Sequence, residues 1–224
     1  MGRTLVRALA VSAIAFTTLT SAVWAQTIVP DLRAVSTGAG WHGDRTSASL
    51  TDKDGAPAVL FSTPRQHLVW LDGFEFSEGV IEFDVRGRNV PQGSFPGIAF
   101  RVIDARTYDA VYFRPFNFHA TDSAQRAHAV QYESEPDNRW DRLRKEFPGQ
   151  YEQPLPNAPS PDDWFHVRVV VEGRQVRVYV NDATQPALTV TELSARRRGS
   201  VGVFATAYGA IANLRITPKA AASR

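Results

Sequence analysis

The sequence contains no cysteine and only one methionine among its 224 residues. The absence of cysteine excludes disulfide bonds, thiolate metal sites and a cysteine nucleophile. No two histidines have the spacing of a zinc site, and no acceptor sequence for N-glycosylation occurs. The sequence also has almost no excess of charge of one sign, since 25 Lys and Arg are balanced by 23 Asp and Glu. The sequence therefore offers no electrostatic reason to expect a polyanionic partner.

The first 25 residues have the layout of a secretory signal peptide. Arg3 and Arg7 precede a mostly apolar segment, Leu9–Leu19, and Val23 and Ala25 occupy positions −3 and −1 of a cleavage point. An N-terminal membrane anchor is the alternative, but the apolar run is short and contains Ser and Thr. We expect cleavage after residue 25 and a periplasmic or secreted bacterial protein, with no later membrane span.

Removal of this segment leaves a neutral chain. Arg3 and Arg7 account for the whole net charge of +2. The basic triplet Arg196–Arg198 is too short for a nucleic-acid surface, so we expect no nucleic-acid partner. The Gly38–Gly43 segment matches a dinucleotide-binding spacing but has no strand before it and no helix after it. A nucleotide cofactor is therefore not expected.

Apolar and polar residues alternate with a period of two along most of the mature chain. The alternation is clearest in Val80–Arg86, Phe165–Val171 and Val176–Val180, and Glu172-Gly173 reads as a hairpin turn. Further strands are expected at Ala58–Ser62, His67–Leu71, Gly97–Asp104, Tyr108–Arg114, Arg126–Glu133, Ala187–Val190, Ser200–Thr206 and Gly209–Thr217. This pattern predicts an all-β fold, a two-sheet antiparallel β-sandwich of jelly-roll type, spanning residues 26–218 as a single domain with a frayed tail at 219–224.

A proline-rich excursion from Ser134 to Asp163 interrupts the alternation. Trp140, Leu143 and Phe147 have the spacing of one face of a short helix, and the residues after Ser134 resemble a helix start. Long excursions in small β domains often serve function, so this one is either a lid over a site or a cover for a sheet edge.

Several segments together resemble the concanavalin A-like lectin/glucanase superfamily. The segments are Phe76–Asp84, Gly97–Arg101, Arg114–Phe118, His128–Tyr132, Asp163–Phe165, Gly199–Phe204 and Ala212–Ile216, with Tyr108 and Tyr112 between them. Within the superfamily they are most similar to bacterial exported domains of the 3-keto-disaccharide hydrolase type and to laminin-G-like sandwiches. The resemblance implies two antiparallel sheets and a carbohydrate ligand on one sheet or its rim.

The family-16 glycoside hydrolases of this superfamily carry three closely spaced acids on one strand. Here Glu82 and Asp84 supply two, but Arg86 and Gly87 stand where the third is needed. The pair is spaced for two carboxylates on one strand face, as a retaining hydrolase requires. The other interpretation is a charged outer face paired with Arg168 or Arg177 across the sheet.

A better candidate site is the set of polar and aromatic residues between Gly97 and Glu133. Alternate residues of a strand point to opposite faces of the sheet, and we call this rule parity. Parity places Arg101, Tyr112 and Arg114 on the polar faces of their strands. It puts His128 and Tyr132 on one face of the next strand and Gln131 and Glu133 on the other, without deciding which pair lies beside the arginines. Polar side chains of this kind bind sugar hydroxyls, and aromatic rings cover the C–H faces of sugar rings. The alternative is a structural role, in which the arginines pair with Glu across buried strands. The predicted ligand-binding residues are Arg101, Tyr112, Arg114, Asn117, Gln131, Tyr132, Trp140 and Arg144.

These residues support three alternative functions. The leading one is an exported carbohydrate-binding domain. The second is a glycoside hydrolase of the 3-keto-disaccharide type, using Glu133, Glu82 or Asp84 with His128 as an auxiliary proton-transfer group. The third is a non-catalytic adhesion or assembly module. No cofactor is required, although Asp104 either joins a calcium site or forms an Asx turn.

Overall fold

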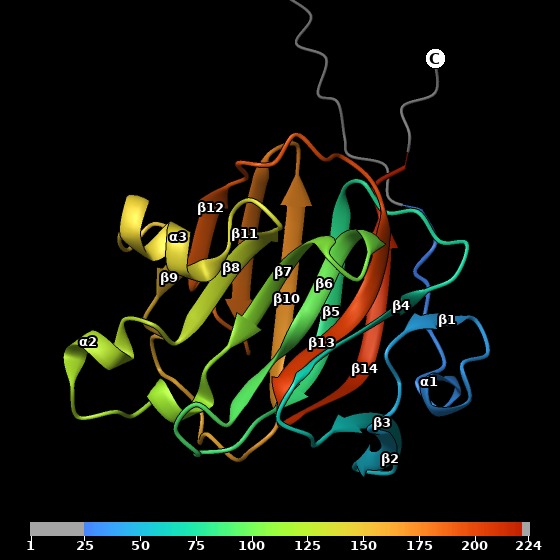
Figure 1. Ribbon diagram of the computed structural model, residues 1–224, viewed down its shortest axis with the longest axis horizontal. Coiled ribbons are helices and arrows are strands. Elements are labelled where there is room, and N and C mark those ends of the chain that lie inside the picture. The colour runs from blue at the N-terminus through green and yellow to red at the C-terminus, as the bar shows by residue number, and fades with distance from the viewer. Residues whose placement is uncertain (1–24, 221–224) are drawn as a thin grey trace, which may run out of the picture.

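The computed structural model describes residues 25–220 and consists of two seven-stranded antiparallel sheets stacked face to face (Figure 1). The first sheet has the order β1 (Trp41–Gly43), β4 (Gln66–Leu71), β13 (Ser200–Ala207), β6 (Ser94–Asp104), β7 (Thr107–Phe113), β8 (Val130–Glu135), β9 (Glu152–Gln153). The second has the order β12 (Leu188–Thr191), β11 (Gln175–Val180), β10 (Phe165–Glu172), β5 (Gly79–Arg86), β14 (Gly209–Pro218), β3 (Ala56–Phe61), β2 (Ala48–Lys53). The helical segments are α1 (Ala34–Thr37), η1 (Pro115–Asn117), α2 (Ser123–Arg126) and α3 (Trp140–Glu146).

The predicted β-sandwich is therefore confirmed, and its core lies where the alternation placed it. Ile81, Phe83 and Val85 of β5 point between the sheets, as do Val167 and Val169 of β10, and all are fully buried. Their neighbours in sequence lie on the outer face of the second sheet. A period of two is what a strand with one face on a core requires.

The strands that the sequence did not reveal lie at sheet edges. β1 and β9 have three and two residues, and β2 ends the second sheet with a largely exposed pattern. Such strands bury few side chains, so they leave little alternation to read. The expected strand from Arg126 also begins later, because α2 and a turn occupy the residues before Val130.

A β-bulge in β6 overturns the expected orientation of Arg101. The register between β6 and β7 shifts between Phe100 and Asp104, and Arg101 has a left-handed φ of 50°. Parity predicted that Phe100 and Val102 share a face, but Phe100 lies in the main core whereas Val102 packs on the outer face. A bulge adds one residue to a strand and reverses the faces beyond it.

The excursion after β8 both covers the sheet edge and approaches its outer face. β8 continues to Glu135, so the expected helix start at Ser134 is wrong and α3 begins at Trp140. Leu143 is buried in the main core, and the rings of Tyr132 and Tyr151 pack against each other in the same cluster. Figure 1 shows α3 beside β8 at one end of the first sheet.

The predicted signal peptide lies, except for Ala25, outside the described residues. Of the predicted tail, Lys219 pairs with Glu78 at 3.0 Å, and residues 221–224 lie outside the described range. Between residues 25 and 220, no helix has both the length and the apolar character needed to cross a membrane.

Candidate functional site

A cleft of about 450 Å³ lies on the outer face of the first sheet. Its walls come from β8 and α3 on one side and from β4, β6, β13 and η1 on the other. The side chains that line it are Gln66, Pro91, Gln92, Phe95, Tyr112, Arg114, Phe116, Asn117, Gln125, His128, Glu133, Glu135, Arg139, Trp140, Arg144, Phe204 and Thr206. Seven of the residues predicted from the sequence are among them: Tyr112, Arg114, Asn117, His128, Glu133, Trp140 and Arg144.

Glu133 is the carboxylate at the base of this cleft. It is only 4% exposed, and the hydroxyl of Tyr112 donates a hydrogen bond to it at 3.4 Å. Burial raises the pKa of Glu133 to about 7, and the nearby charge of Glu135 adds to the rise, while the backbone N–H of Trp140 and the charge of Arg114 oppose it. A carboxyl group with this pKa exchanges its proton near neutral pH, as a general acid or base must.

Arg114 is held beside Glu133 by a set of hydrogen bonds. Its guanidinium donates to the hydroxyl of Tyr112 at 3.2 Å, to the side-chain oxygen of Gln131 at 3.1 Å and to the backbone oxygen of His128 at 3.1 Å. Gln131 is completely buried and bonds the backbone of Tyr132 and Tyr151. Gln131 thus lies behind the cleft and fixes Arg114, whereas it was predicted to contact the ligand.

Glu152 of β9 lies close to three basic side chains, those of Arg144, Arg114 and His128. Arg144 donates to both of its oxygens, at 2.7 and 2.6 Å, and Arg114 lies 3.6 Å away. His128 Nδ1 lies 2.9 Å from Glu152 Oε1, but its orientation does not form a hydrogen bond. Burial lowers the pKa of His128, the charges of Arg144 and Arg114 lower it further, and Glu152 opposes them. His128 therefore faces the cleft as a neutral imidazole at neutral pH.

Trp140 is the exposed aromatic residue at the mouth of the cleft. It is the first residue of α3 and is 38% exposed. The guanidinium of Arg144, one helical turn later, lies 4.9 Å from the centre of its ring. A partly exposed indole held by a cation offers a flat apolar surface, which suits the C–H face of a sugar ring.

The sequence pattern of one protein family, the 3-keto-alpha-glucoside-1,2-lyase-like domain, matches residues 35–212. This range includes every residue of the cleft and all strands of both sheets except the end of β14. The chain belongs to this family. No curated protein matches the chain in sequence.

Several solved structures share the β-sandwich fold of this lyase-like domain. It is similar to the carbohydrate-binding module CBM66 from Bacillus subtilis, with a TM-score of 0.54 at 13% identity over 79% of this chain and 95% of that one. It is also similar to a beta-glucanase from Bacillus licheniformis, with 0.55 at 12% identity over 88% and 99%, and to a kappa-carrageenase from Pseudoalteromonas carrageenovora, with 0.53 at 14% identity over 87% and 96%. At these identities the likeness defines the fold.

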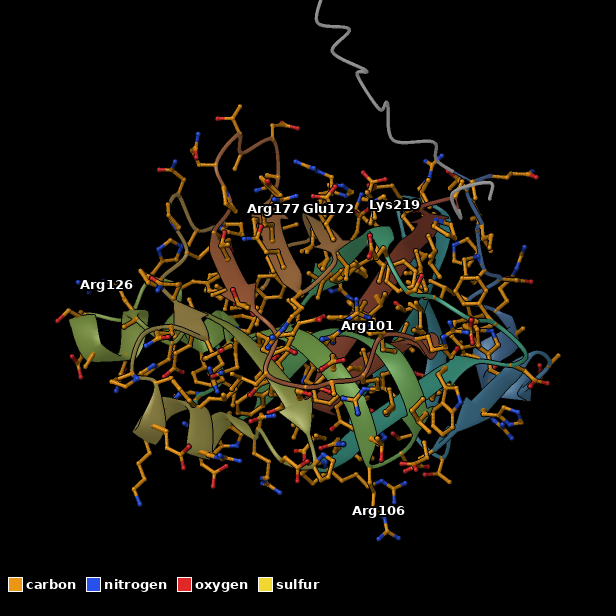
Figure 2. The ribbon with its side chains drawn as sticks, turned by 90° about the horizontal axis from the view of Figure 1, so that it is seen from above. Arg101, Arg106, Arg126, Glu172, Arg177 and Lys219 are labelled. Carbon is orange, nitrogen blue, oxygen red and sulfur yellow. The ribbon has the colours of Figure 1, made fainter. Side chains whose placement is uncertain are left out.

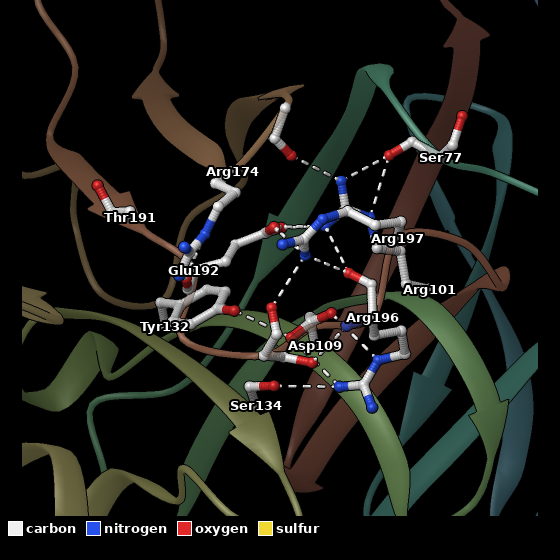
Figure 3. Close-up of polar contacts among 12 residues, drawn as sticks. Ser77, Arg101, Asp109, Tyr132, Ser134, Arg174, Thr191, Glu192, Arg196 and Arg197 are labelled. Carbon is white, nitrogen blue, oxygen red and sulfur yellow. Dashed lines mark hydrogen bonds and ion pairs between the residues drawn. The ribbon is translucent and has the colours of Figure 1, made fainter.

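Arg101 and Tyr132 do not reach the cleft of the lyase-like domain. The bulge turns Arg101 inward, where it bonds both oxygens of Glu192 and the backbone oxygens of Ser77 and Gly173 (Figure 3). Tyr132 lies in the core and donates to Asp109 at 2.9 Å. The prediction that Arg101 faces the same groove as Arg114 is therefore wrong, because the arginine ties the two sheets together instead.

Glu82 and Asp84 lie on the other sheet, on its outer face. His166 Nδ1 lies 2.9 Å from one oxygen of Asp84, and the Asn213 amide donates to the other at 2.6 Å. Burial disfavours the charged form, but these two hydrogen bonds, together with the charges of Lys53 and His166, outweigh it and lower the pKa of Asp84. The pair thus fits the charged-face interpretation, with His166 as partner.

The arginines expected to pair with these two acids have other neighbours. Arg177 of β11 pairs with Glu172 of the neighbouring strand β10, and both residues are labelled in Figure 2. Arg168 lies opposite Glu82 in the sheet, but its guanidinium packs over the ring of Tyr179, 4.0 Å from the centroid. Neither arginine therefore pairs with Glu82 or Asp84.

Asp104, the calcium candidate, lies in the hairpin between β6 and β7. One of its oxygens accepts the backbone N–H of Arg106 at 2.8 Å, which closes the Asx turn. Within residues 25–220, no group of three or more His, Asp or Glu residues is arranged to hold a metal ion.

Several cleft residues were not predicted. Glu135 comes two residues after Glu133 on the same strand face, so parity could have identified it. Phe116 lies in a single helical turn, where no periodic signal exists. The same holds for Glu152, which binds Arg144 from a two-residue strand behind the cleft lining. Phe95 and Phe204 carry no polar group, and no phenylalanine was among the predicted ligand-binding residues. The aromatic wall of the cleft was therefore missed as a group.

Proposed function

We propose that this cleft binds a 3-keto-α-glucoside and that Glu133 transfers a proton while the bond between carbon 1 and the glycosidic oxygen breaks. The observation that carries the proposal is Glu133 itself, a buried carboxyl with a pKa of about 7 at the base of a polar cleft. The family name supplies the substrate class and the 1,2-elimination. The predicted export of the chain places this activity in the bacterial periplasm or exterior.

The chemistry needs one base and one acid. The ketone at carbon 3 acidifies the proton on carbon 2, and the carboxylate of Glu133 takes that proton. A double bond forms between carbons 1 and 2, and the bond from carbon 1 to the glycosidic oxygen breaks. The departing oxygen receives the proton that Glu133 has taken, directly or relayed through His128, and leaves as an alcohol, so no water or oxidant is consumed. His128, neutral and facing the same cleft, is the auxiliary proton-transfer group.

The arginine beside Glu133 suits the same reaction. Negative charge develops on the oxygen of the ketone when carbon 2 loses its proton, and a fixed cation stabilises such charge. Arg114 is positioned by three hydrogen bonds and is buried, so it needs little rearrangement to serve this purpose. Arg144, whose two nitrogens are occupied by Glu152, instead supports the wall and Trp140.

A direct test uses methyl 3-keto-α-glucoside and measures the release of methanol. We expect turnover by the native protein and a loss of at least about 100-fold in kcat for Glu133→Gln, since general acid–base groups contribute on this scale. Glu146→Gln, an exposed position on α3, is the matched control and should keep full activity. Turnover that survives Glu133→Gln would remove the assignment.

Saccharide binding without chemistry is the second candidate function. Trp140 at the cleft mouth and the polar groups of Arg114 and Asn117 are suited to hold a sugar whether or not it reacts. Calorimetry with methyl α-glucoside and its 3-keto form separates the two functions. Heat of binding without methanol release would support a binding module, and the absence of both would leave the adhesion module as the remaining proposal.

A further inference from the structure

The cleft has two chemically different halves. The half formed by β8 and α3 carries Glu133, Glu135, Arg139 and Arg144. The other half is formed by β6, β13 and η1 and is dominated by phenylalanine, with Phe95, Phe116 and Phe204. A ligand that spans the cleft therefore meets hydrogen-bonding groups at one end and aromatic rings at the other.

The rings form one continuous wall. Phe95 meets Phe116 edge to face at 5.4 Å between centroids, and it meets Tyr112 in the same way at 6.3 Å. Tyr112 in turn lies 5.5 Å from Phe204. Phe95 and Phe116 are only half-buried, so part of each ring is open to the cleft. This is the spacing at which aromatic side chains attract one another, and an added ring from a ligand extends the same packing.

Most polar side chains of this half are already engaged or lie at its rim. The Gln66 amide donates to the hydroxyl of Tyr108 at 2.8 Å, and the buried Asn117 amide donates to the backbone oxygen of His128 at 3.3 Å. Gln92 is exposed at the rim, and Thr206 contributes one hydroxyl. A second sugar ring placed here would leave several hydroxyls against phenylalanine, and each polar group that loses water without gaining a partner is costly. An aromatic group carries no such cost and gains from burial.

Tyr112 joins the two halves. Its hydroxyl donates to Glu133, while its ring packs against Phe95 and Phe204. A glycosidic bond positioned for proton transfer at Glu133 therefore has the aromatic wall on the side of Tyr112 away from α3. With the keto sugar in the polar half, the leaving group extends over the rings.

We propose that the aromatic half is a leaving-group subsite for an aryl or arylalkyl aglycone, so that the substrates of this domain are glycosides of aromatic alcohols or phenols. This inference rests on the proposed function for its orientation of the substrate. The aromatic wall itself is a binding surface that can be measured without any reaction.

The binding experiment compares benzyl α-glucoside with methyl α-glucoside by calorimetry on the full chain. The two ligands share the sugar and differ only by the phenyl ring. We expect benzyl α-glucoside to bind about tenfold or more tightly, because burial of a phenyl ring is worth at least that factor. Phe116→Ser should abolish most of the difference while leaving methyl α-glucoside binding within about twofold. Ile103→Ser, an exposed apolar position outside the cleft, is the matched control.

The turnover experiment uses the 3-keto forms of the same two glucosides. Benzyl alcohol and methanol are nearly equal as leaving groups, so a difference in kcat/KM reports the subsite and not the chemistry. We expect about a tenfold preference for the benzyl substrate that Phe116→Ser removes.

The outcomes separate the two proposals. Equal binding of the benzyl and methyl glucosides, or a Phe116→Ser variant that weakens both alike, overturns the subsite. Absence of turnover together with a benzyl preference in binding overturns the lyase function and keeps the subsite. Turnover of both substrates at equal rates, dependent on Glu133 and indifferent to Phe116, keeps the function and overturns the subsite.

Discussion

Arg101 and Glu192 form an ion pair that is buried at both ends. Each side chain is about 1% exposed, and one nitrogen of Arg101 contacts both oxygens of Glu192. The remaining donors of the arginine reach the backbone oxygen of Ser77, in the connection that leads into β5, and that of Gly173, in the hairpin between β10 and β11. A charge placed between two sheets is stable there only because every donor has a partner.

Loss of this carboxylate should destabilise the fold. We expect Glu192→Gln to lower the free energy of unfolding by about 3 kcal/mol or more, since it leaves a buried guanidinium without its counter-charge. Urea unfolding measures the change. The control is Arg106→Gln, because Arg106 projects from the surface of the neighbouring hairpin whereas Arg101 lies inside (Figure 2). Equal stability of the two variants would contradict the structural role of the pair.

The raised pKa of Glu133 makes the stability of the protein depend on pH. Its pKa of about 7 lies above the ordinary 4.5, so the folded protein holds a proton that the unfolded chain releases between these values. The stability contributed by this group is therefore complete below pH 4.5 and is lost as the pH rises through 7. Relative to the native protein, Glu133→Gln should gain about 2 to 3 kcal/mol more at pH 8 than at pH 5. A gain that is independent of pH would show that Glu133 has an ordinary pKa.

The same group should govern the pH dependence of cleavage. If the carboxylate of Glu133 takes the proton from carbon 2, kcat/KM for methyl 3-keto-α-glucoside rises with pH through about 7 and then levels. Initial rates between pH 5 and pH 9 measure this profile. A profile that falls through the same pH range would assign Glu133 as the acid, and a flat profile would remove it from the proton transfer.

Glu152 should control the ionisation of His128 across the cleft wall. The carboxylate lies 2.9 Å from His128 Nδ1 and opposes the lowering of the His128 pKa by burial and by the two arginines. We expect Glu152→Gln to lower the pKa of His128 further, as measured by NMR of the imidazole protons. An unchanged or higher pKa would show that Glu152 does not act on this ring.

The acids on the other sheet should be dispensable for cleavage. Asp84→Asn removes the hydrogen-bond partner that raises the pKa of His166, so that pKa should fall. Release of methanol from methyl 3-keto-α-glucoside should remain within about twofold of the native rate, because Asp84 lies outside the cleft. A large loss of activity in a folded Asp84→Asn variant would return the catalytic role to this pair.

Features that depend on regular strands were predictable from the sequence. Alternation in Val80–Arg86 and Phe165–Val171 located the core, and parity placed Glu133 on the same face as Gln131. Parity failed for Arg101, because a bulge without a glycine at the left-handed position leaves no mark in the residue pattern. It also separated His128 from Glu133, since the strand begins two residues after His128.

Residues in segments too short to show a periodic pattern could not be predicted from the sequence. Glu152 reaches Arg144 from a two-residue strand, and Phe116 reaches Phe95 from a single 3-10 turn. Their positions depend on how the chain between the strands folds back, and local periodicity does not encode that. The sequence thus indicated Glu133, Trp140 and Arg144 of the polar half but none of the phenylalanines of the aromatic half.

Beneath the aromatic wall, the sheet is built from small residues. Gly97 lies between Tyr112 and Phe204 in the sheet, and a Cβ on it would meet the backbone oxygen of Val111 at 2.1 Å. Ala99 and Ala110 lie opposite each other and pack in the same outer-face cluster as the two rings. A larger side chain at Ala99 or Ala110 would displace the neighbouring rings and make the cleft shallower. The depth of the proposed leaving-group subsite can thus be tuned from underneath, by residues that never touch a ligand.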